Sequence, residues 1–141
     1  MSEDFPDVRQ YSDNDCGSAC LIAIVRHMKG VSDSAEIHTL MNGRDEIGSA
    51  YDIVAFARRL SLDAIGASVP ARDLTADQLP AILHWGWNHF VVLYGHDAGG
   101  ARILDPSGGK FYLPWDLVER NHTGVTLLFG RAATVLANGA Q

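Results

Sequence analysis

The stretch RQYSDNDCGSACLIAIV, residues 9–25, places an acidic, turn-prone run directly before a cysteine and an almost uninterrupted apolar segment. The residues at positions 13–15 are Asp, Asn and Asp, which are types that cap helix N-termini. They predict a helix that has Asp15 as its cap and Cys16 as its first residue. The apolar run at 19–25 is too continuous for a surface helix, so this helix should be buried on most sides.

A cysteine at the first position of a helix lies at the positive end of the helix macrodipole. That environment lowers the pKa of the thiol and favours the reactive thiolate. We therefore expect Cys16 to be exposed at the mouth of the helix, whereas Cys20, one turn further on, should be a small buried hydrophobic residue. Position alone is equally compatible with a Cys16 that merely packs at a helix end.

The composition limits the classes of function. The chain has 141 residues, 47% of them hydrophobic, and a net charge of −6, which predicts one domain with a core at about 8–130. The tail 131–141 shows no clear pattern and could be disordered.

The sequence has no basic patch, so a nucleic-acid partner is not expected. No apolar run approaches the roughly 20 residues that span a bilayer, and the start MSEDFPDVRQ is not a secretory signal. The two cysteines predict free thiols in a reducing cytosol.

Helices are expected first along the chain. Asp33 with Glu36 resembles a capping box for a short helix that ends near Met41, and Ser49 with Asp52 marks another helix start. Strands follow, because short apolar runs are separated by Gly, Asp and Asn. These runs are LDAIGAS (62–68), PAILHW (80–85), HFVVLYG (89–95), ARILD (101–105), KFYL (110–113) and GVTLLFG (124–130). PWDLVERN (114–121) reads as one short helix. The order predicts an α+β fold with an antiparallel sheet.

A nucleophilic cysteine needs a base, and the base needs an orienting partner. Of the six histidines, His89 opens one strand and Asp105 closes the next. A hairpin folded symmetrically about Asp97 would place His89 and Asp105 opposite each other on one face. An incidental pair at two strand ends is the alternative, and the register could slip. His84 is the weaker candidate for the base.

Gln10 precedes Cys16 by five intervening residues, so a loop can bring its amide beside the thiol. An amide donor and the backbone N–H of Cys16 could form an oxyanion hole. Taken alone, Gln10 would more simply be a surface residue. The chain lacks GxSxG, HExxH, CxxC and phosphate-loop motifs, so no cofactor or metal is expected. A metal site of His84, His89 and Asp105 is conceivable but lacks a ligand pattern.

Four segments together resemble the bacteriocin-processing, double-glycine-leader cysteine peptidases, a papain-like family. They are Q-x5-DCGSACL, LPAILHWGWNHFVVL, ILDPSGG and TGVTLLF, and they span Gln10 to about Phe129 in the family's order. The resemblance implies that Cys16 is the nucleophile and His89 its general base. It also implies that Asp105 orients the imidazole and that Gln10 helps to form the oxyanion hole. The fold that it implies packs the cysteine helix against an antiparallel sheet.

The resemblance further implies a substrate and a setting. Members of this family cut the leader from a precursor peptide after Gly-Gly, in the cytoplasm, at the cytosolic N-terminus of an ABC exporter. The expected partners are therefore a precursor with an amphipathic leader helix and an exporter in cis or in trans. The 141 residues lack membrane helices and a nucleotide-binding motif, so the chain is either free-standing or the peptidase portion of an exporter.

Two other functions fit the same residues. A papain-like effector could use the same triad as an amidase or deamidase, and an open cleft would favour it. Alternatively, a leader-binding adaptor would bind without turnover, as relatives that lack the cysteine do. Trp85 and Trp87 could line a narrow cleft, although packing in the core or hairpin explains them equally well.

Overall fold

The computed structural model describes residues 5–10, 16–30, 48–86 and 88–139. Its α-helices are α1 (Cys16–Lys29), α3 (Ala50–Arg59), α4 (Trp115–Asn121) and α5 (Arg131–Gly139), with short 3₁₀ helices η2 (Ala71–Asp73) and η3 (Ala76–Gln78). The strands are β1 (Ala64–Ser68), β2 (Ala81–Trp85), β3 (His89–His96), β4 (Gly100–Asp105), β5 (Gly109–Pro114) and β6 (His122–Phe129). The predicted α+β class and all six predicted strands are confirmed.

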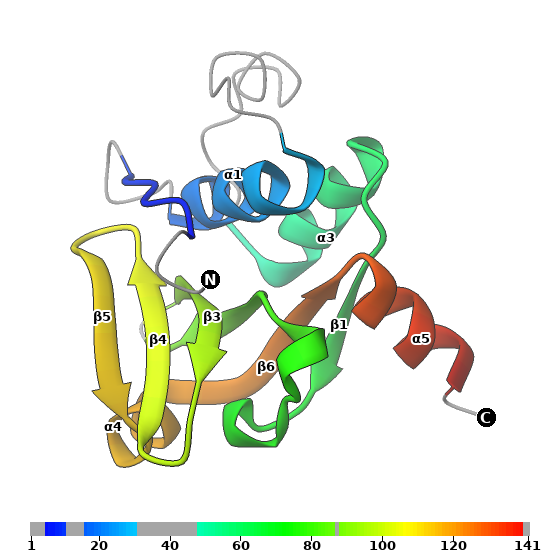
Figure 1. Cartoon of the computed structure of the whole chain (residues 1–141). Coiled ribbons are helices and arrows are strands. Elements are labelled where there is room, and N and C mark those ends of the chain that lie inside the picture. Colours follow the sequence, from blue (N-terminus) through cyan, green and yellow to red (C-terminus); the bar gives the residue numbers. More distant parts are fainter. Residues whose placement is uncertain (1–4, 11–15, 31–47, 87, 140–141) are drawn as a thin grey trace.

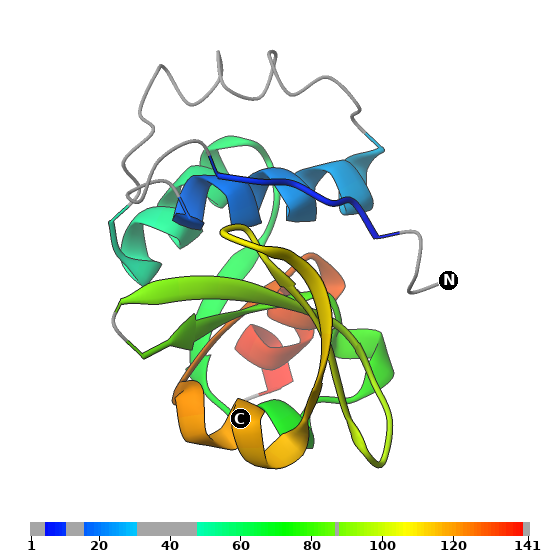
Figure 2. The same ribbon diagram turned by 90° about the vertical axis from the view of Figure 1, so that its left-hand side faces the viewer.

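The six strands form one antiparallel sheet in the order β1-β6-β2-β3-β4-β5. Helices α1 and α3 cover one face of this sheet, and α4 and α5 lie on the other side (Figures 1 and 2). The two views agree that α1 and α3 lie side by side. The nucleophile helix expected from the sequence therefore packs on the sheet, against β3 in particular.

The central strands β2, β3 and β4 read as nearly continuous apolar runs because both faces of the sheet are buried there. On β3, Phe90 and Val92 point into the core beneath α1 and α3. Val91 and Leu93 point into the second core, beneath α4 and α5. Side chains alternate across a strand, so a strand between two helical layers needs apolar residues at every position.

Helix α1 is buried at ten consecutive positions, from Cys16 to Val25, as its apolar run predicts. Each fully buried Leu or Ile side chain stabilises the fold by roughly 1.5–3 kcal/mol relative to an exposed one. Because Leu21, Ile22 and Ile24 are all at most 2% exposed, the start of α1 is held rigidly on the sheet. The Ser49 cap of α3 is confirmed, since its hydroxyl accepts a hydrogen bond from the Asp52 amide at 3.1 Å.

The predicted register of the β3–β4 hairpin is wrong by two residues. Val92 pairs with Leu104 and Leu93 with Ile103, so Asp105 lies diagonally across from His89 rather than opposite it. The turn spans Asp97–Gly100, where the Asp97 carboxylate accepts hydrogen bonds from the amides of Gly99 and Gly100. An irregularity at Leu93–Gly95 adds a further shift. A two-residue slip keeps both side chains on the same face, so they can still meet.

The tail is a second correction, because residues Arg131–Gly139 form helix α5 instead of a disordered segment. Ala133 is 3% exposed, and the Thr134 hydroxyl donates to Asp63 at 2.7 Å. The predicted cap of α1 at residues 13–15 and the predicted helix at 33–41 lie outside the described residues. None of the helices in the described ranges is long and apolar enough to cross a membrane.

Candidate active site

Cys16 is the first residue of α1, as predicted, but it is only 7% exposed. The expectation of an exposed thiol is therefore wrong, because β3 packs against this end of the helix. Burial raises the pKa of Cys16, but hydrogen bonds from the His89 side chain and the backbone of Phe90 and Gly17, together with the charge on His89, outweigh burial. The pKa of Cys16 consequently lies below its usual value, which favours the thiolate.

His89 begins β3 and connects the cysteine to a carboxylate. Its Nε2–H donates to Asp105 Oδ1 at 2.8 Å, and the imidazole also shares a hydrogen bond with the Cys16 thiol. The hydrogen bonds to Asp105 and then to Cys16 raise the pKa of His89 to about 9, although burial opposes this. At neutral pH the imidazole is therefore protonated beside a thiol whose pKa is lowered. This is the charge arrangement of a thiolate–imidazolium pair.

Asp105 ends β4 and is held by a tight turn. Besides His89, its Oδ1 accepts from the backbone N–H of Ser107 at 3.0 Å and from the Ser107 hydroxyl at 2.7 Å. Burial raises the pKa of Asp105, but the hydrogen bonds from His89 and Ser107 bring it down to about 2. The carboxylate thus stays ionised and points one oxygen at the imidazole.

Gln10 is half-buried, and its backbone fixes its place. Its N–H donates to the carbonyl of Pro106 at 3.0 Å, next to Asp105. The structure therefore brings Cys16, His89 and Asp105 into one chain of contacts. It anchors Gln10 on the turn that carries Asp105.

His84, the weaker candidate for the base, lies in a different environment. Its Nδ1 lies 2.9 Å from the Thr123 hydroxyl, and its Nε2 lies 3.1 Å from the Asn88 side-chain oxygen. Both ring nitrogens therefore have neutral partners. The geometry favours His89 as the base.

Cys20 is fully buried, as predicted, and its thiol donates to the carbonyl of Phe90 at 3.3 Å. Burial, followed by the charges of Cys16 and Asp105, raises the pKa of Cys20 well above its usual value. Trp85 is half-buried and packs against the core on the α4 and α5 side of the sheet, and Trp87 lies outside the described residues. The described part of the chain contains no cluster of three or more His, Cys, Asp or Glu that could hold a metal ion.

The sequence reasoning missed Ser107, which makes two of the contacts that Asp105 Oδ1 receives. A signal was present in the segment Asp-Pro-Ser, since an aspartate commonly bonds the backbone N–H two residues further on. The double use of Ser107, through its amide and its hydroxyl, depends on a side-chain rotamer that the sequence alone does not determine.

Comparisons with known proteins agree with this geometry. The model of the Peptidase C39 family matches residues 4–134. A probable microcin-H47 secretion/processing ATP-binding protein from Escherichia coli is 29% identical over 136 residues, which are 96% of this chain and 20% of that protein. The colicin V secretion/processing ATP-binding protein from Escherichia coli is 29% identical over 86% of this chain and 18% of its own length. The chain thus spans about a fifth of the length of these curated relatives.

A solved structure supports the same assignment. The double glycine motif protease from an AMS/PCAT transporter, in complex with the leader peptide, is 28% identical, with a TM-score of 0.74 over 88% of this chain and 89% of that one. The peptidase domain of Streptococcus ComA shares the fold with a TM-score of 0.74 over 89% of this chain and 98% of that one, at 24% identity. The expected papain-like fold is confirmed. The chain belongs to the Peptidase C39 family and is a cysteine peptidase of that family.

Proposed function

We propose that this chain removes the leader from a precursor peptide by cutting after a Gly-Gly pair, with Cys16 as nucleophile, His89 as acid and base, and Asp105 as orienting carboxylate. The contact chain from the Cys16 thiol through His89 to Asp105 carries this proposal. The pKa of Cys16 lies below its usual value, and the pKa of His89 is about 9. These values favour a thiolate beside an imidazolium, which is the charge state that nucleophilic attack needs.

In the first half of the reaction, the Cys16 thiolate attacks the carbonyl carbon of the second glycine, and a C–S bond forms. Negative charge moves to the carbonyl oxygen, where the Cys16 N–H and the Gln10 side-chain amide donate hydrogen bonds. Removing one such donor typically costs about 10²–10³ in rate. His89 then gives its proton to the leaving amine, the C–N bond breaks, and a thioester remains.

In the second half, His89 is neutral and accepts a proton from water while the water oxygen attacks the thioester. The C–S bond breaks, the leader leaves with a new carboxylate, and the Cys16 thiolate and His89 imidazolium are restored. Asp105 holds the imidazole in one tautomer throughout and stabilises its positive charge. Its own pKa of about 2 keeps it ionised in both halves.

Glycine on the leader side of the cut suits Cys16, because this residue is only 7% exposed. A residue without Cβ can bring its carbonyl closer to a recessed sulfur than a larger residue can. The relatives are described as secretion/processing proteins, and one matched protease was solved with its leader peptide. These descriptions support a double-glycine leader as the substrate.

An apolar groove between α3 and the β1 and β6 strands offers a surface for a leader helix. Its volume is about 540 Å³, and Tyr51 and Val125 on its wall are 79% and 39% exposed. Apolar anchors at helical spacing would fill such a groove, while Arg58 and Arg59 at its rim would attract acidic residues on the leader.

We further propose that this cleavage takes place in the cytoplasm, beside an ABC exporter in cis or in trans that carries the product. The relatives named as ATP-binding secretion/processing proteins support this partner. Both cysteines are free thiols, which suits a reducing compartment.

The test is a cleavage assay on a synthetic double-glycine leader peptide, followed by mass spectrometry of the products. The parent should cut after the second glycine, and Cys16→Ala should bind the peptide without cutting it. Equal cleavage of a peptide with Leu-Leu in place of Gly-Gly would reject the double-glycine specificity. Binding without turnover by the parent would identify an adaptor, and release of ammonia from glutamine peptides would identify an amidase.

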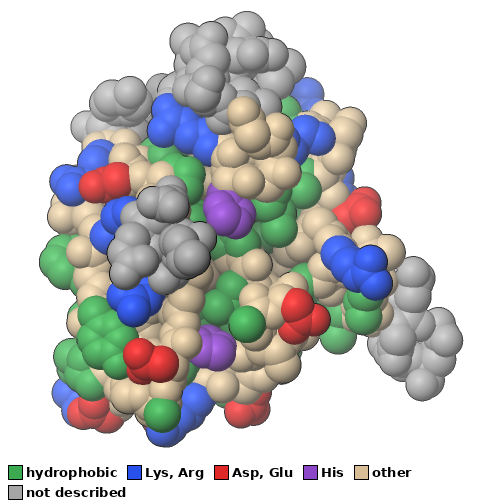
Figure 3. Space-filling view, in the orientation of Figure 1, with side chains coloured by type: hydrophobic (Ala, Val, Ile, Leu, Met, Phe, Trp, Pro, Cys, Tyr) green, Lys and Arg blue, Asp and Glu red, His purple; other side chains and the backbone are tan. Residues whose placement is uncertain are grey.

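The groove has its own test with a matched control. Tyr51→Ala should raise KM for the leader peptide and leave kcat unchanged, because the groove provides affinity away from the reaction. Phe111→Ala is the control, since Phe111 is also exposed, at 46%, but lies on β5, where hydrophobic side chains gather on the left of Figure 3. An equal rise in KM in both variants would contradict docking in the groove.

A further inference from the structure

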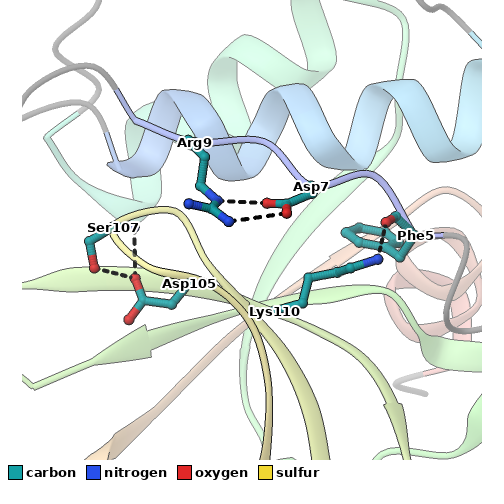
Figure 4. Close-up of polar contacts among 6 residues, drawn as sticks. All are labelled: Phe5, Asp7, Arg9, Asp105, Ser107 and Lys110. Atoms are coloured by element: carbon teal, nitrogen blue, oxygen red, sulfur yellow. Dashed lines mark hydrogen bonds and ion pairs between the residues drawn. The ribbon is translucent and has the colours of Figure 1, made fainter.

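The segment at residues 5–10, here called the arm, carries Gln10 and lies along α1 beside the β4–β5 hairpin (Figures 2 and 4). It is extended and belongs to no strand or helix. Because Gln10 is the proposed side-chain donor to the oxyanion, whatever fixes the arm also determines where that donor lies.

Both ends of the arm are fixed to the same hairpin. At one end, Gln10 N–H donates to the Pro106 carbonyl at 3.0 Å. At the other end, the Lys110 ammonium donates to the Phe5 carbonyl at 2.9 Å (Figure 4). Pro106 lies in the β4–β5 turn and Lys110 lies just after it, so one turn determines the register of the arm and also follows Asp105 directly.

The Phe5 end is also fixed by packing. Phe5 is 3% exposed, and its ring stacks on Tyr94 with ring centroids 4.9 Å apart and an interplanar angle of 6°. The ammonium of Lys110 lies 5.8 Å from the centroid of the same Tyr94 ring. Lys110 therefore holds the Phe5 backbone at the place where the Phe5 side chain is buried. The anchor resists both sliding and lifting of the arm.

The middle of the arm fits closely over the turn. The Arg9 guanidinium is held by the Asp7 carboxylate at 2.7 and 3.2 Å and lies against Gly109. A Cβ at Gly109 would lie 2.6 Å from Arg9 Nη2, and Gly109 has a φ of +117° that favours glycine. The exposed Asp7–Arg9 pair adds little stability by itself. It nevertheless orients the guanidinium over Gly109, where a side chain would collide with it.

We propose that Lys110 is a positioning residue for the oxyanion hole: by holding the Phe5 carbonyl, it fixes the register of the arm on the β4–β5 hairpin and thereby places Gln10 beside Cys16. This inference rests on the proposed role of Gln10 in the reaction. A misplacement of about 1 Å can cost on the order of 10²-fold in rate, so an anchor five residues away can affect kcat.

The experiment is a double-mutant cycle measured as kcat and KM on a synthetic double-glycine leader peptide. Lys110→Met keeps the aliphatic stem but removes the donor, and it should lower kcat about tenfold with little change in KM, as expected for a loss felt only in the transition state. In a Gln10→Ala background the same change should cost nothing further, because the donor it positions is already absent. Lys110→Arg should restore most of kcat, since it keeps a cationic donor.

Arg102→Met is the matched control. Arg102 is a cation on the same hairpin, but its guanidinium lies 5.9 Å from the centroid of the Tyr112 ring rather than against a residue of the arm. The Arg102→Met variant should therefore leave kcat unchanged. Thermal unfolding of each variant separates loss of folding from loss of positioning.

The outcomes distinguish the proposed oxyanion role of Gln10 from the proposed positioning role of Lys110. Full kcat in Gln10→Ala would overturn the proposed oxyanion role and, with it, the role of Lys110. A large loss in Gln10→Ala together with an additive loss from Lys110→Met would overturn only the positioning role. An equal loss in Arg102→Met would likewise refute it, because the effect would then belong to hairpin charge in general.

Discussion

The first and second turns of α1 carry the same residue type in opposite chemical states. Cys16 and Cys20 lie one turn apart, and both contact the backbone of Phe90. The amide side of Phe90 lowers the pKa of Cys16, whereas the carbonyl side accepts the thiol proton of Cys20. The neighbouring strand therefore differentiates the two thiols, by offering a donor to one and an acceptor to the other.

The two histidines on the β2–β3 hairpin show the same principle. His89 contacts a carboxylate and a thiol, and its pKa rises to about 9. His84 contacts the Thr123 hydroxyl and the Asn88 amide oxygen. The chemical role of each residue follows from its partners. Substitutions that remove these partners one at a time test this statement.

The largest expected effect is that of the base. His89→Ala should lower kcat by roughly 10²–10⁴-fold, the range typical of general acid–base catalysis. His84→Ala is the matched control on the same hairpin and should stay close to the parent. Steady-state cleavage of a double-glycine leader peptide measures both. A loss in His84→Ala as large as in His89→Ala would contradict the assignment of His89, and full activity of His89→Ala would move the base to His84.

The orienting carboxylate should matter less than the base, because a thiolate and an imidazolium partly hold each other in place. Asp105→Asn should lower kcat by roughly 10–10²-fold, in line with the roughly 1.5–3 kcal/mol of a hydrogen bond to a charged group. Ser107→Ala should cost a smaller factor, because it removes one of the two Ser107 donors and keeps the amide.

The pH profile checks the same pair with a defined sign. The pKa of His89 is raised to about 9, mainly by Asp105, so kcat/KM in the parent should fall as pH rises through about 9 and the imidazolium loses its proton. Asp105→Asn removes the charge that raises this pKa, so the basic limb should move to lower pH. A basic limb that does not move would show that Asp105 does not control the protonation of His89.

Much of this site was predictable, because each main member occupies the end of an element that the sequence marks. Cys16 follows a capping run, His89 opens an apolar strand, and Asp105 closes another. The prediction that His89 and Asp105 meet held although the predicted β3–β4 register was wrong, because the shift was an even number of residues. A slip of one residue would have turned the two side chains to opposite faces.

The unpredicted parts are contacts between distant segments. Lys110 and Phe5 are separated by 105 positions, and no periodic pattern connects them. Helix α5 was missed because the sequence offers no capping run before it, although Ala132, Ala133 and Leu136 form an apolar face that packs on the second core. The Thr134–Asp63 hydrogen bond helps to fix the helix. The low exposure of Cys16 likewise depends on β3, which the local sequence does not specify.

Alkylation tests the difference between the two thiols directly. Brief iodoacetamide treatment of the folded protein at neutral pH, followed by peptide mapping, should label Cys16 and spare Cys20. In His89→Ala the labelling of Cys16 should slow, and its pH midpoint should rise, because burial would then raise the thiol pKa without the opposing imidazole. Preferential labelling of Cys20 in the folded parent would contradict the assignment.

The smallest expected effect is that of Cys20→Ala. The thiol is fully buried and bonded to the Phe90 carbonyl, so its removal should lower the free energy of unfolding by roughly 1 kcal/mol, about the value of one buried methylene-sized group. Activity should remain close to that of the parent, because the Phe90 amide that lowers the pKa of Cys16 is held by the β2–β3 ladder through the Phe90 pairing with His84. Urea unfolding and kcat measured on the same preparation test both statements. A large loss of kcat with intact stability would show that the second turn of α1 tunes the nucleophile, and the two thiols would then act as one unit.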